Sequence, residues 1–257
     1  TIHYADLGND ITWNDLSIPD VASETSIFNT TLCMAFDQND ESHFYVGTSF
    51  GILEYRNYSY DKTYNTENST LKTNDIFIEN TFVTSLLYDN DKNLWALNGF
   101  FNILPINKMD AQGNWEVINC KTNSTDTQNR SLEGAFISSH NGHLWFTNSN
   151  WDGSGLYAYN METGKLNSYF NFVNQDGLLI NTNPYFFRPI EDADGNIWVP
   201  TSNGPVYLSK DDIAAGNCIF TQPKINRDDD TGLADYLLGE VYCYVIAIDK
   251  AQRKWTT

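Results

Sequence analysis

Basic side chains are scarce in this chain of 257 residues. It contains 15 Lys and Arg against 33 Asp and Glu, which gives a formal net charge of -18 at pH 7. A surface of this sign offers few cations that could replace the counterions condensed on a nucleic acid. The composition therefore argues against a nucleic-acid partner.

Long apolar runs are missing and cysteine is rare. No stretch approaches the ~20 apolar residues that a membrane-spanning helix needs, and the mean hydropathy is -0.44. We therefore expect no membrane span. The four cysteines (Cys33, Cys120, Cys218 and Cys243) have no CxxC spacing, so we expect core thiols rather than a zinc site. Cys120 and Cys218 fall on outer strands of different predicted sheets, too far apart for a disulfide.

One phrase recurs about every 50 residues. Its copies begin at Leu32, Val83, Gly134, Arg188 and Tyr244. Each has an aromatic residue at its centre, and successive centres are 50, 50, 53 and 57 residues apart: Tyr45, Trp95, Trp145, Trp198 and Trp255. A fixed period of this length indicates a structural repeat.

Every copy follows the same pattern. An apolar stretch ends at an acid or its substitute (Asp37, Asp89, Ser139, Asp192 and Asp249), and a polar turn then leads into the aromatic-centred strand. A Gly-containing loop, a third strand and a more variable fourth strand follow. Asp and Asn before Gly favour tight hairpin turns. The unit is predicted to be a four-stranded antiparallel meander.

Such sheets bury both faces when they pack radially, so the repeat predicts an all-β fold, a β-propeller of four-stranded antiparallel blades. We expect one propeller domain or fragment over 1–257, with blades at 28–81, 82–132, 133–184 and 185–239 and a partial blade at 240–257. Residues 1–27 read as strands of a split or preceding blade. The termini either complete one another's blade and close a ring of five, or the chain is an arc of a larger propeller. We favour the arc. The absence of a signal peptide at the start fits a mature or excised piece.

Sequence signatures of catalysis are not found. The Asp-x-Asp-Gly-Asn turn at Asp192 resembles the start of a calcium loop, but Asn203 stands where that loop needs a Glu. We therefore interpret the repeat acids as turn residues. His140 and His143 flank a turn and have no third ligand nearby. We predict a non-enzymatic chain without metal or cofactor; the alternative, a carbohydrate-active hydrolase or lyase, would have to build its acid pair from loops.

One set of loops is a candidate binding surface. The loops after the aromatic strands should emerge on one face of the propeller and carry Phe50, Phe100, Phe101, Trp151 and Asp152. Such residues can stack on sugar rings or contact a partner protein. Alternatively, they fold back and seal the gaps between blades. Arg188, on an inner strand, is predicted to bind an anion or to pair with a neighbouring acid.

The phrase DADGNIWVPTSNG, from Asp192 to Gly204, resembles the two-component regulator propeller repeat. That resemblance implies a periplasmic sensor domain of a hybrid histidine kinase from Bacteroidetes-like bacteria. The C-terminal third, including NQDGLLINTNPYFFRPIEDADGNIWV, resembles the PorZ-like propeller proteins associated with type IX secretion. This second resemblance implies a periplasmic or cell-surface scaffold that recognises a glycan, a lipopolysaccharide or an envelope protein. Members of the PorZ-like family have more blades and a C-terminal module, so further domains of a parent protein are expected.

Overall fold

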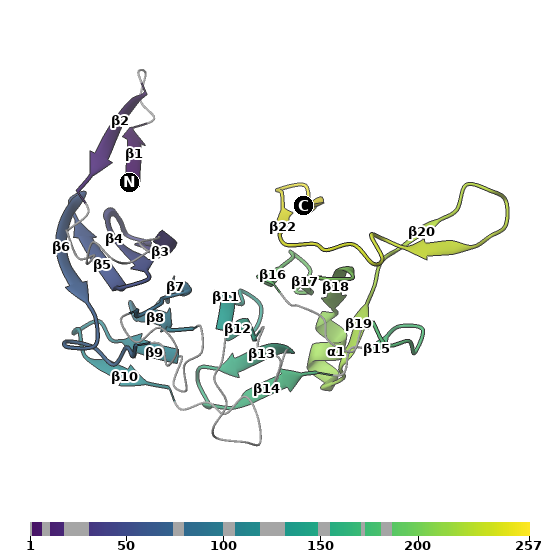
Figure 1. Cartoon of the computed structure of the whole chain (residues 1–257). Coiled ribbons are helices and arrows are strands. Elements are labelled where there is room, and N and C mark those ends of the chain that lie inside the picture. The colour runs from purple at the N-terminus through teal and green to yellow at the C-terminus, as the bar shows by residue number, and fades with distance from the viewer. Residues whose placement is uncertain are drawn as a thin grey trace. The chain divides into compact units, whose positions relative to one another are not determined.

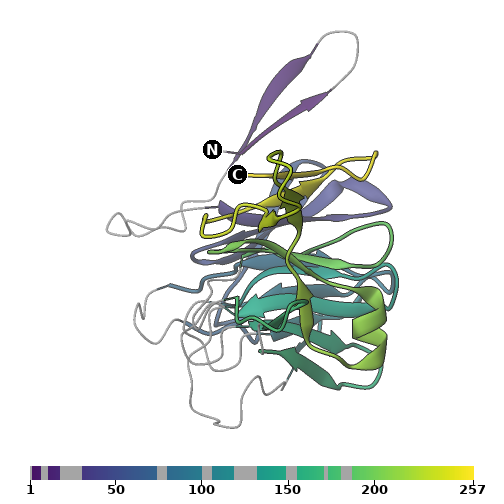
Figure 2. The same ribbon diagram turned by 90° about the vertical axis from the view of Figure 1, so that its right-hand side faces the viewer.

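The computed structural model describes residues 2–6, 11–17, 31–73, 80–99, 106–118, 132–148, 155–170, 173–180 and 187–257. The chain forms two compact units, Thr1–Asn119 (unit 1) and Cys120–Thr257 (unit 2). Strands dominate both units (Figures 1 and 2). The one helix among the described residues spans six residues, and none has the length and apolar composition needed to cross a membrane.

Unit 1 contains a hairpin and two four-stranded antiparallel sheets. The hairpin is β1 (Ile2–Asp6) and β2 (Thr12–Leu16). Sheet 1 runs in chain order through β3 (Thr31–Asp37), β4 (Asp40–Thr48), β5 (Gly51–Arg56) and β6 (Ser59–Tyr64). Sheet 2 consists of β7 (Ser85–Tyr88), β8 (Leu94–Leu97), β9 (Ile106–Met109) and β10 (Trp115–Val117), also in chain order.

Unit 2 repeats the meander twice. Sheet 3 comprises β11 (Leu132–Ile137), β12 (His143–Asn148), β13 (Gly155–Asn160) and β14 (Leu166–Tyr169). Sheet 4 comprises β16 (Ile190–Glu191), β17 (Ile197–Thr201), β18 (Gly204–Leu208) and β19 (Ile219–Thr221), with β15 (Val173–Asn174) added in parallel beside β19. Two hairpins follow: β20 (Lys224–Asn226) with β21 (Ala234–Tyr236), and β22 (Ile246–Ile248) with β23 (Lys254–Thr256).

Apolar side chains fill the space between neighbouring sheets of each unit. In unit 1, Tyr45 and Ile52 of sheet 1 share a buried cluster with Leu86 and Ala96 of sheet 2. In unit 2, Trp145, Leu156 and Tyr169 of sheet 3 pack with Val199, Val206 and Phe220 of sheet 4. Within each unit, the two sheets therefore bury a face against one another, as the repeat requires.

The repeat acids close their hairpins, and three of them also bind the repeat tryptophan. Asp192 Oδ1 accepts the backbone N–H groups of Asp194 and Asn196, each at 3.0 Å, and Asp192 Oδ2 accepts the Trp198 indole N–H at 2.8 Å. The Asp89–Trp95 pair has the same bond at 2.8 Å. Asp249 and Trp255 repeat it at 3.1 Å. The predicted turn role is confirmed, with the indole bond as an addition.

The third copy departs from this pattern because its turn is one residue longer. Ser138, rather than the predicted Ser139, occupies the turn position: Ser138 Oγ accepts the backbone N–H groups of His140 and Asn141 at 3.2 Å. The Ser139 assignment was therefore wrong by one residue. A serine hydroxyl in a longer turn does not reach the indole, and Trp145 Nε1 is buried without a partner among the described residues.

One element was not foreseen from the sequence. Helix α1 (Lys210–Ala215) lies between β18 and β19, where only a fourth strand was expected. Its first turn is capped by the Ser209 hydroxyl, which accepts the Asp212 backbone N–H, and Gly216 ends it with φ of 73°. The β1–β2 hairpin places Ile2 and Leu16 in a buried cluster with the first sheet.

Candidate functional site

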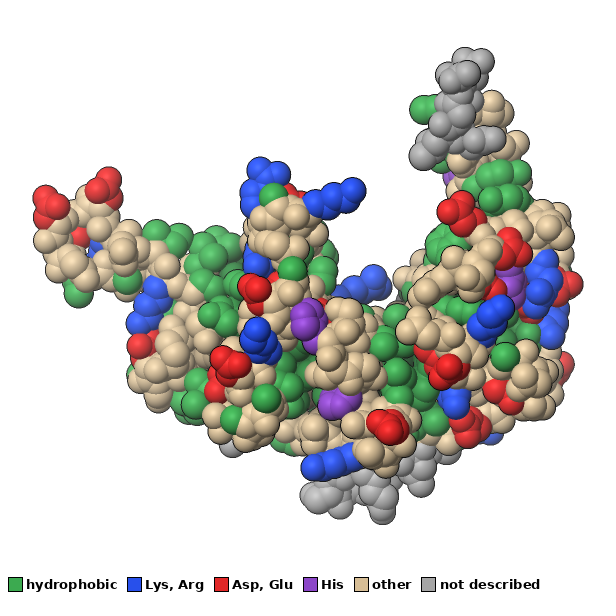
Figure 3. Space-filling model, turned by 180° about the vertical axis from the view of Figure 1, so that it is seen from behind, with side chains coloured by type: hydrophobic (Ala, Val, Ile, Leu, Met, Phe, Trp, Pro, Cys, Tyr) green, Lys and Arg blue, Asp and Glu red, His purple; other side chains and the backbone are tan. Residues whose placement is uncertain are grey.

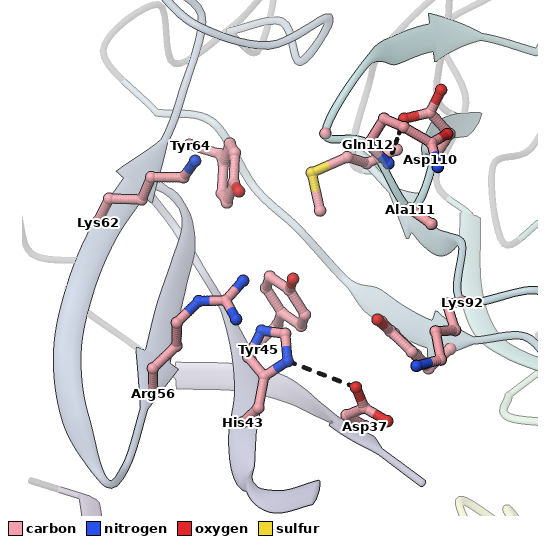
Figure 4. A pocket seen from close by; sticks show the side chains of 13 residues that line it. Asp37, His43, Tyr45, Arg56, Lys62, Tyr64, Lys92, Asp110, Ala111 and Gln112 are labelled. Carbon is pink, nitrogen blue, oxygen red and sulfur yellow. Dashed lines mark hydrogen bonds and ion pairs between the residues drawn. The ribbon is translucent and has the colours of Figure 1, made fainter. Parts of the chain in front are cut away.

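A cavity of about 340 Å³ lies between sheets 1 and 2 of unit 1 (Figure 4). Its 13 lining residues come from the strands of sheet 1 and, in sheet 2, from β7, the end of β9 and the β7–β8 and β9–β10 turns. Charged residues and tyrosines dominate the lining: Asp37, His43, Tyr45, Arg56, Lys62, Tyr64, Tyr88, Lys92 and Asp110. Figure 3 likewise shows basic, histidine and acidic side chains gathered on one face of this unit.

A buried carboxylate, Glu54, organises the cavity wall. Its side chain is 1% exposed, and its Oε1 accepts hydrogen bonds from His43 Nε2 at 2.9 Å, the Tyr45 hydroxyl at 3.2 Å and Arg56 Nη2 at 2.5 Å. The Tyr64 hydroxyl donates to Oε2 at 2.8 Å. Because a carboxylate only accepts, His43 Nε2 is the donor in its bond to Glu54. One anion thus fixes four donors from three strands.

The register of sheet 1 explains this arrangement. Glu54 on β5 lies directly opposite Tyr45 on β4, and Lys62 on β6 lies on its other side. In sheets 2 and 4 the residues opposite the repeat tryptophan are Lys108 and Tyr207. Sheet 1 therefore differs at two paired positions. A phenol replaces the indole, and its hydroxyl bonds the carboxylate across the strand pair.

The network shifts the acidity of its members. Burial alone would raise the pKa of Glu54, but the hydrogen bonds from Tyr64, His43 and Arg56 together hold it below its ordinary value. Burial and the neighbouring Glu54 carboxylate raise the pKa of both Tyr45 and Tyr64. At neutral pH the site therefore holds an ionised Glu54 and protonated phenols.

Asp37 completes the network at the end of β3. Its Oδ2 lies 3.5 Å from His43 Nδ1, so the imidazole stands between two carboxylates. The backbone N–H of Asn39 donates to Asp37 Oδ1 at 2.9 Å. That bond lowers the pKa of Asp37, with His43 and the nearby Lys92 acting in the same direction against burial. Asp37 is therefore a further fixed negative charge.

Two lysines at the cavity have no carboxylate partner among the described residues. The Lys62 ammonium lies 4.5 Å from the centre of the Tyr64 ring, and Figure 4 shows it reaching toward that ring from the side of sheet 1. Lys92 stands across the cavity, in the β7–β8 turn of sheet 2. The site thus offers cationic groups from both sheets.

Of the predicted binding residues, the structure describes Phe50 in the loop after β4. Phe50 is half-buried; it pairs with Thr81 through an isolated parallel bridge, and its backbone N–H donates to the Thr48 hydroxyl at 3.0 Å. It follows the C-terminal end of β4 and is not among the residues that line the cavity. Four further predicted residues lie outside the described part of the chain: Phe100, Phe101, Trp151 and Asp152.

Arg188 and the two turn histidines lie in unit 2. Arg188 is exposed just before β16, with its Cα close to Gly134, and it has no ion pair with a described residue. His140 Nδ1 lies 3.3 Å from Glu191, and His143 contacts Asn160 at 3.1 Å. In the part of the chain that the structure describes, no three His, Cys, Asp or Glu side chains are grouped as metal ligands.

The repeat aromatics all lie on the second strand of their sheets or hairpin: Tyr45, Trp95, Trp145, Trp198 and Trp255. The first three are buried, Trp198 is half-buried and Trp255 is 58% exposed. Cys33, Cys218 and Cys243 form no disulfide, and Cys120 lies outside the described residues. That Cys120 and Cys218 lie too far apart to bridge stays a prediction.

Sequence reasoning did not identify the cavity. The available signals were a glutamate inside the apolar strand sequence GILEY and a tyrosine in place of the repeat tryptophan. A charged residue flanked by buried apolar neighbours is itself buried, and a buried charge needs partners. Those two observations together would have indicated a polar site in the first sheet.

Comparison with known proteins finds solved structures only; no family model and no curated protein matches the chain. PorZ, a surface component of the type IX secretion system of Porphyromonas gingivalis, is similar with a TM-score of 0.73 and 20% identity. The match covers 88% of this chain and 31% of PorZ. The extracellular domain of the hybrid two-component system BT4673 of B. thetaiotaomicron is similar with a TM-score of 0.62 and 15% identity, covering 91% of this chain and 27% of that one.

The corresponding domain of BT3049 from B. thetaiotaomicron matches with a TM-score of 0.52 and 15% identity, over 90% of this chain and 32% of that one. The chain thus spans about a third of the length of these structures or less. These structures belong to the two groups that the sequence resembles, the PorZ-like proteins and the propeller domains of two-component systems. The sheets of units 1 and 2 are accordingly blades of the β-propeller fold, as predicted.

Proposed function

We propose that this chain is the recognition part of a larger bacterial cell-envelope protein, located in the periplasm or at the cell surface. It binds a glycan, a lipopolysaccharide or an envelope protein and catalyses no reaction on it. Its fold is that of PorZ, described as a surface component of a secretion system, and of extracellular domains of two-component systems. A scaffold and a sensor both require a recognition surface of this kind.

The state of Glu54 is the observation that carries this proposal. Asp37 and Glu54 lie on either side of His43 at the cavity, so they are the candidates for a pair of hydrolytic carboxyl groups there. A glycosidase needs one carboxyl group with a raised pKa that can reach the substrate. Glu54 has the opposite properties, because it is buried, bonded to four donors and held at a lowered pKa. The cavity is thus better suited to binding than to proton transfer.

The test is a binding and turnover experiment on the purified chain. The immobilised chain is incubated with lipopolysaccharide, with neutral and acidic oligosaccharides and with an envelope extract. The bound ligands are then eluted and their masses are measured by mass spectrometry. We expect saturable binding with every recovered ligand unchanged in mass. Cleaved products that disappear in an Asp37→Asn variant would instead assign the chain to the hydrolases or lyases. Failure of all three ligand classes to bind would refute the recognition role.

A further inference from the structure

Hydrogen-bond acceptors at the cavity are already occupied by protein donors. Both oxygens of Glu54 are bonded. Asp110 Oδ1 accepts the backbone N–H groups of Gln112 and Asn114, and its Oδ2 accepts the Asn114 side chain at 2.9 Å. Asp37 bonds the Asn39 backbone N–H and faces His43. A ligand that offered mainly donors would find few acceptors free.

The cationic donors, in contrast, are not all engaged by carboxylates. Lys62 and Lys92 have no carboxylate partner among the described residues, and Arg56 bonds Glu54 through Nη2 while its Nε lies 3.5 Å from Asp61. Three of the chain's 15 Lys and Arg line this one cavity of 13 residues. In a chain of net charge -18 this concentration is unusual. The cavity calls for a ligand that supplies acceptors and negative charge.

Three tyrosine rings also line the cavity. Tyr45 and Tyr88 are stacked, with ring centres 6.2 Å apart and planes at 22°, and Tyr64 stands on the side of Lys62. Aromatic rings of this kind pack against the apolar face of a sugar or another ring. The volume of about 340 Å³ lies at the small end of ligand pockets, which span roughly 300–1,000 Å³.

We propose that the cavity between sheets 1 and 2 binds a small ring-containing ligand with an oxyanion group, a carboxylate or a phosphate. Lys62 on one side of the cavity or Lys92 on the other donates to the oxyanion, and the tyrosines contact the ring. Glu54 acts as a positioning residue, because it holds His43, Tyr45, Arg56 and Tyr64 in place. This inference rests on the proposed recognition function and names a site and a ligand chemistry for it.

Isothermal titration of the full chain tests the proposal with four probes: glucuronate, glucose 6-phosphate, glucose and inorganic phosphate. We expect at least one of the two acidic sugars to bind more tightly than both glucose and inorganic phosphate. A preference for glucuronate identifies a carboxylate ligand and a preference for glucose 6-phosphate identifies a phosphate ligand. Equal binding of glucose, or no binding of either acidic sugar at millimolar concentration, overturns the proposal.

Charge-removing variants locate the site. Lys62→Met or Lys92→Met, whichever removes the lysine that donates to the oxyanion, should weaken binding of the acidic sugar by about tenfold, the effect of losing one charge-assisted hydrogen bond. Lys165→Met, at an exposed turn of unit 2, is the matched control and should leave affinity unchanged. Unchanged affinity in both cavity variants refutes this site. If lipopolysaccharide, glycan or protein binding persists in the double variant, the recognition function stands and only the cavity assignment fails.

Discussion

Replacing Glu54 by Gln tests whether the buried carboxylate holds the first sheet and its cavity together. Gln has nearly the same shape, so the substitution removes the charge and one acceptor without opening a void. Four donors bond the carboxylate in the native protein: His43, Tyr45, Arg56 and Tyr64. Each would lose the charge-assisted part of its bond, and the new amide would present N–H groups to donors.

The expected cost follows from these contacts. A hydrogen bond to a charged group stabilises by about 1 kcal/mol more than a neutral one, so four bonds give an upper limit of about 4 kcal/mol. The Arg56 side chain is 54% exposed, so water screens its share. The neutral Gln also avoids the desolvation cost of a buried carboxylate, and this gain offsets another part of the lost stability. We expect the free energy of unfolding to fall by about 2–3 kcal/mol at pH 7.

The difference in unfolding free energy between the native protein and Glu54→Gln should disappear at acidic pH. The pKa of Glu54 in the folded protein is below its ordinary value of 4.5. The stability that its ionised form contributes is therefore complete above the unfolded pKa and is lost as the pH falls through the folded pKa. Once protonated, native Glu54 resembles the Gln of the variant. The two proteins should converge in stability once the pH falls below the lowered pKa of Glu54 in the folded protein.

Urea unfolding followed by fluorescence and circular dichroism, at neutral and acidic pH, measures the effect. Glu116→Gln is the control, because Glu116 pairs with Lys108 in the same unit but its side chain is 58% exposed. We expect that control to change stability by less than about 0.5 kcal/mol. The reasoning is refuted if Glu54→Gln is as mild as the control, or if its cost is the same at both pH values.

Two other predictions concern the blades themselves. Asp192→Ala leaves the Trp198 indole N–H without its acceptor and should lower the free energy of unfolding by about 2–4 kcal/mol. Asp249→Ala, at an exposed copy of the same turn, should lower it by less than about 1 kcal/mol. Equal urea midpoints for the two variants would contradict this. Gly51→Ala places a Cβ 2.1 Å from a carbonyl oxygen of the next strand at φ of 115°, so we expect a loss of about 3 kcal/mol or more. Gly113→Ala, at φ of 86° with open space around it, should cost only about 1 kcal/mol; urea unfolding of both glycine variants measures the difference.

The parts of the fold that sequence reasoning predicted are those encoded locally. An acid, a turn with Gly or Asn and a following aromatic specify a hairpin over a few residues, and Asp89 and Asp192 close their hairpins as expected. The order of strands within each sheet followed from those turns. Ser139 was misplaced because a turn one residue longer leaves almost the same sequence pattern.

The parts that were missed depend on contacts between segments distant in sequence or on register. The parallel pairing of β15 with β19 joins Val173 to Ile219, and no local signal marks it. The cavity depends on the β4–β5 register that sets Tyr45 opposite Glu54 and on the Tyr64 hydroxyl reaching across from β6. Spacing along the chain identifies repeats, but it does not tell which single copy has been modified into a site.

The meander order of the sheets has a consequence for how the chain is made. In sheets 1, 2 and 3 every strand pairs with its immediate successor, so these ladders close between near neighbours in sequence. Low contact order of this kind favours rapid formation of each sheet. Each sheet can therefore form as soon as its own strands have left the ribosome. The apolar face that the first sheet of a unit leaves exposed is covered once the next fifty or so residues have been synthesised.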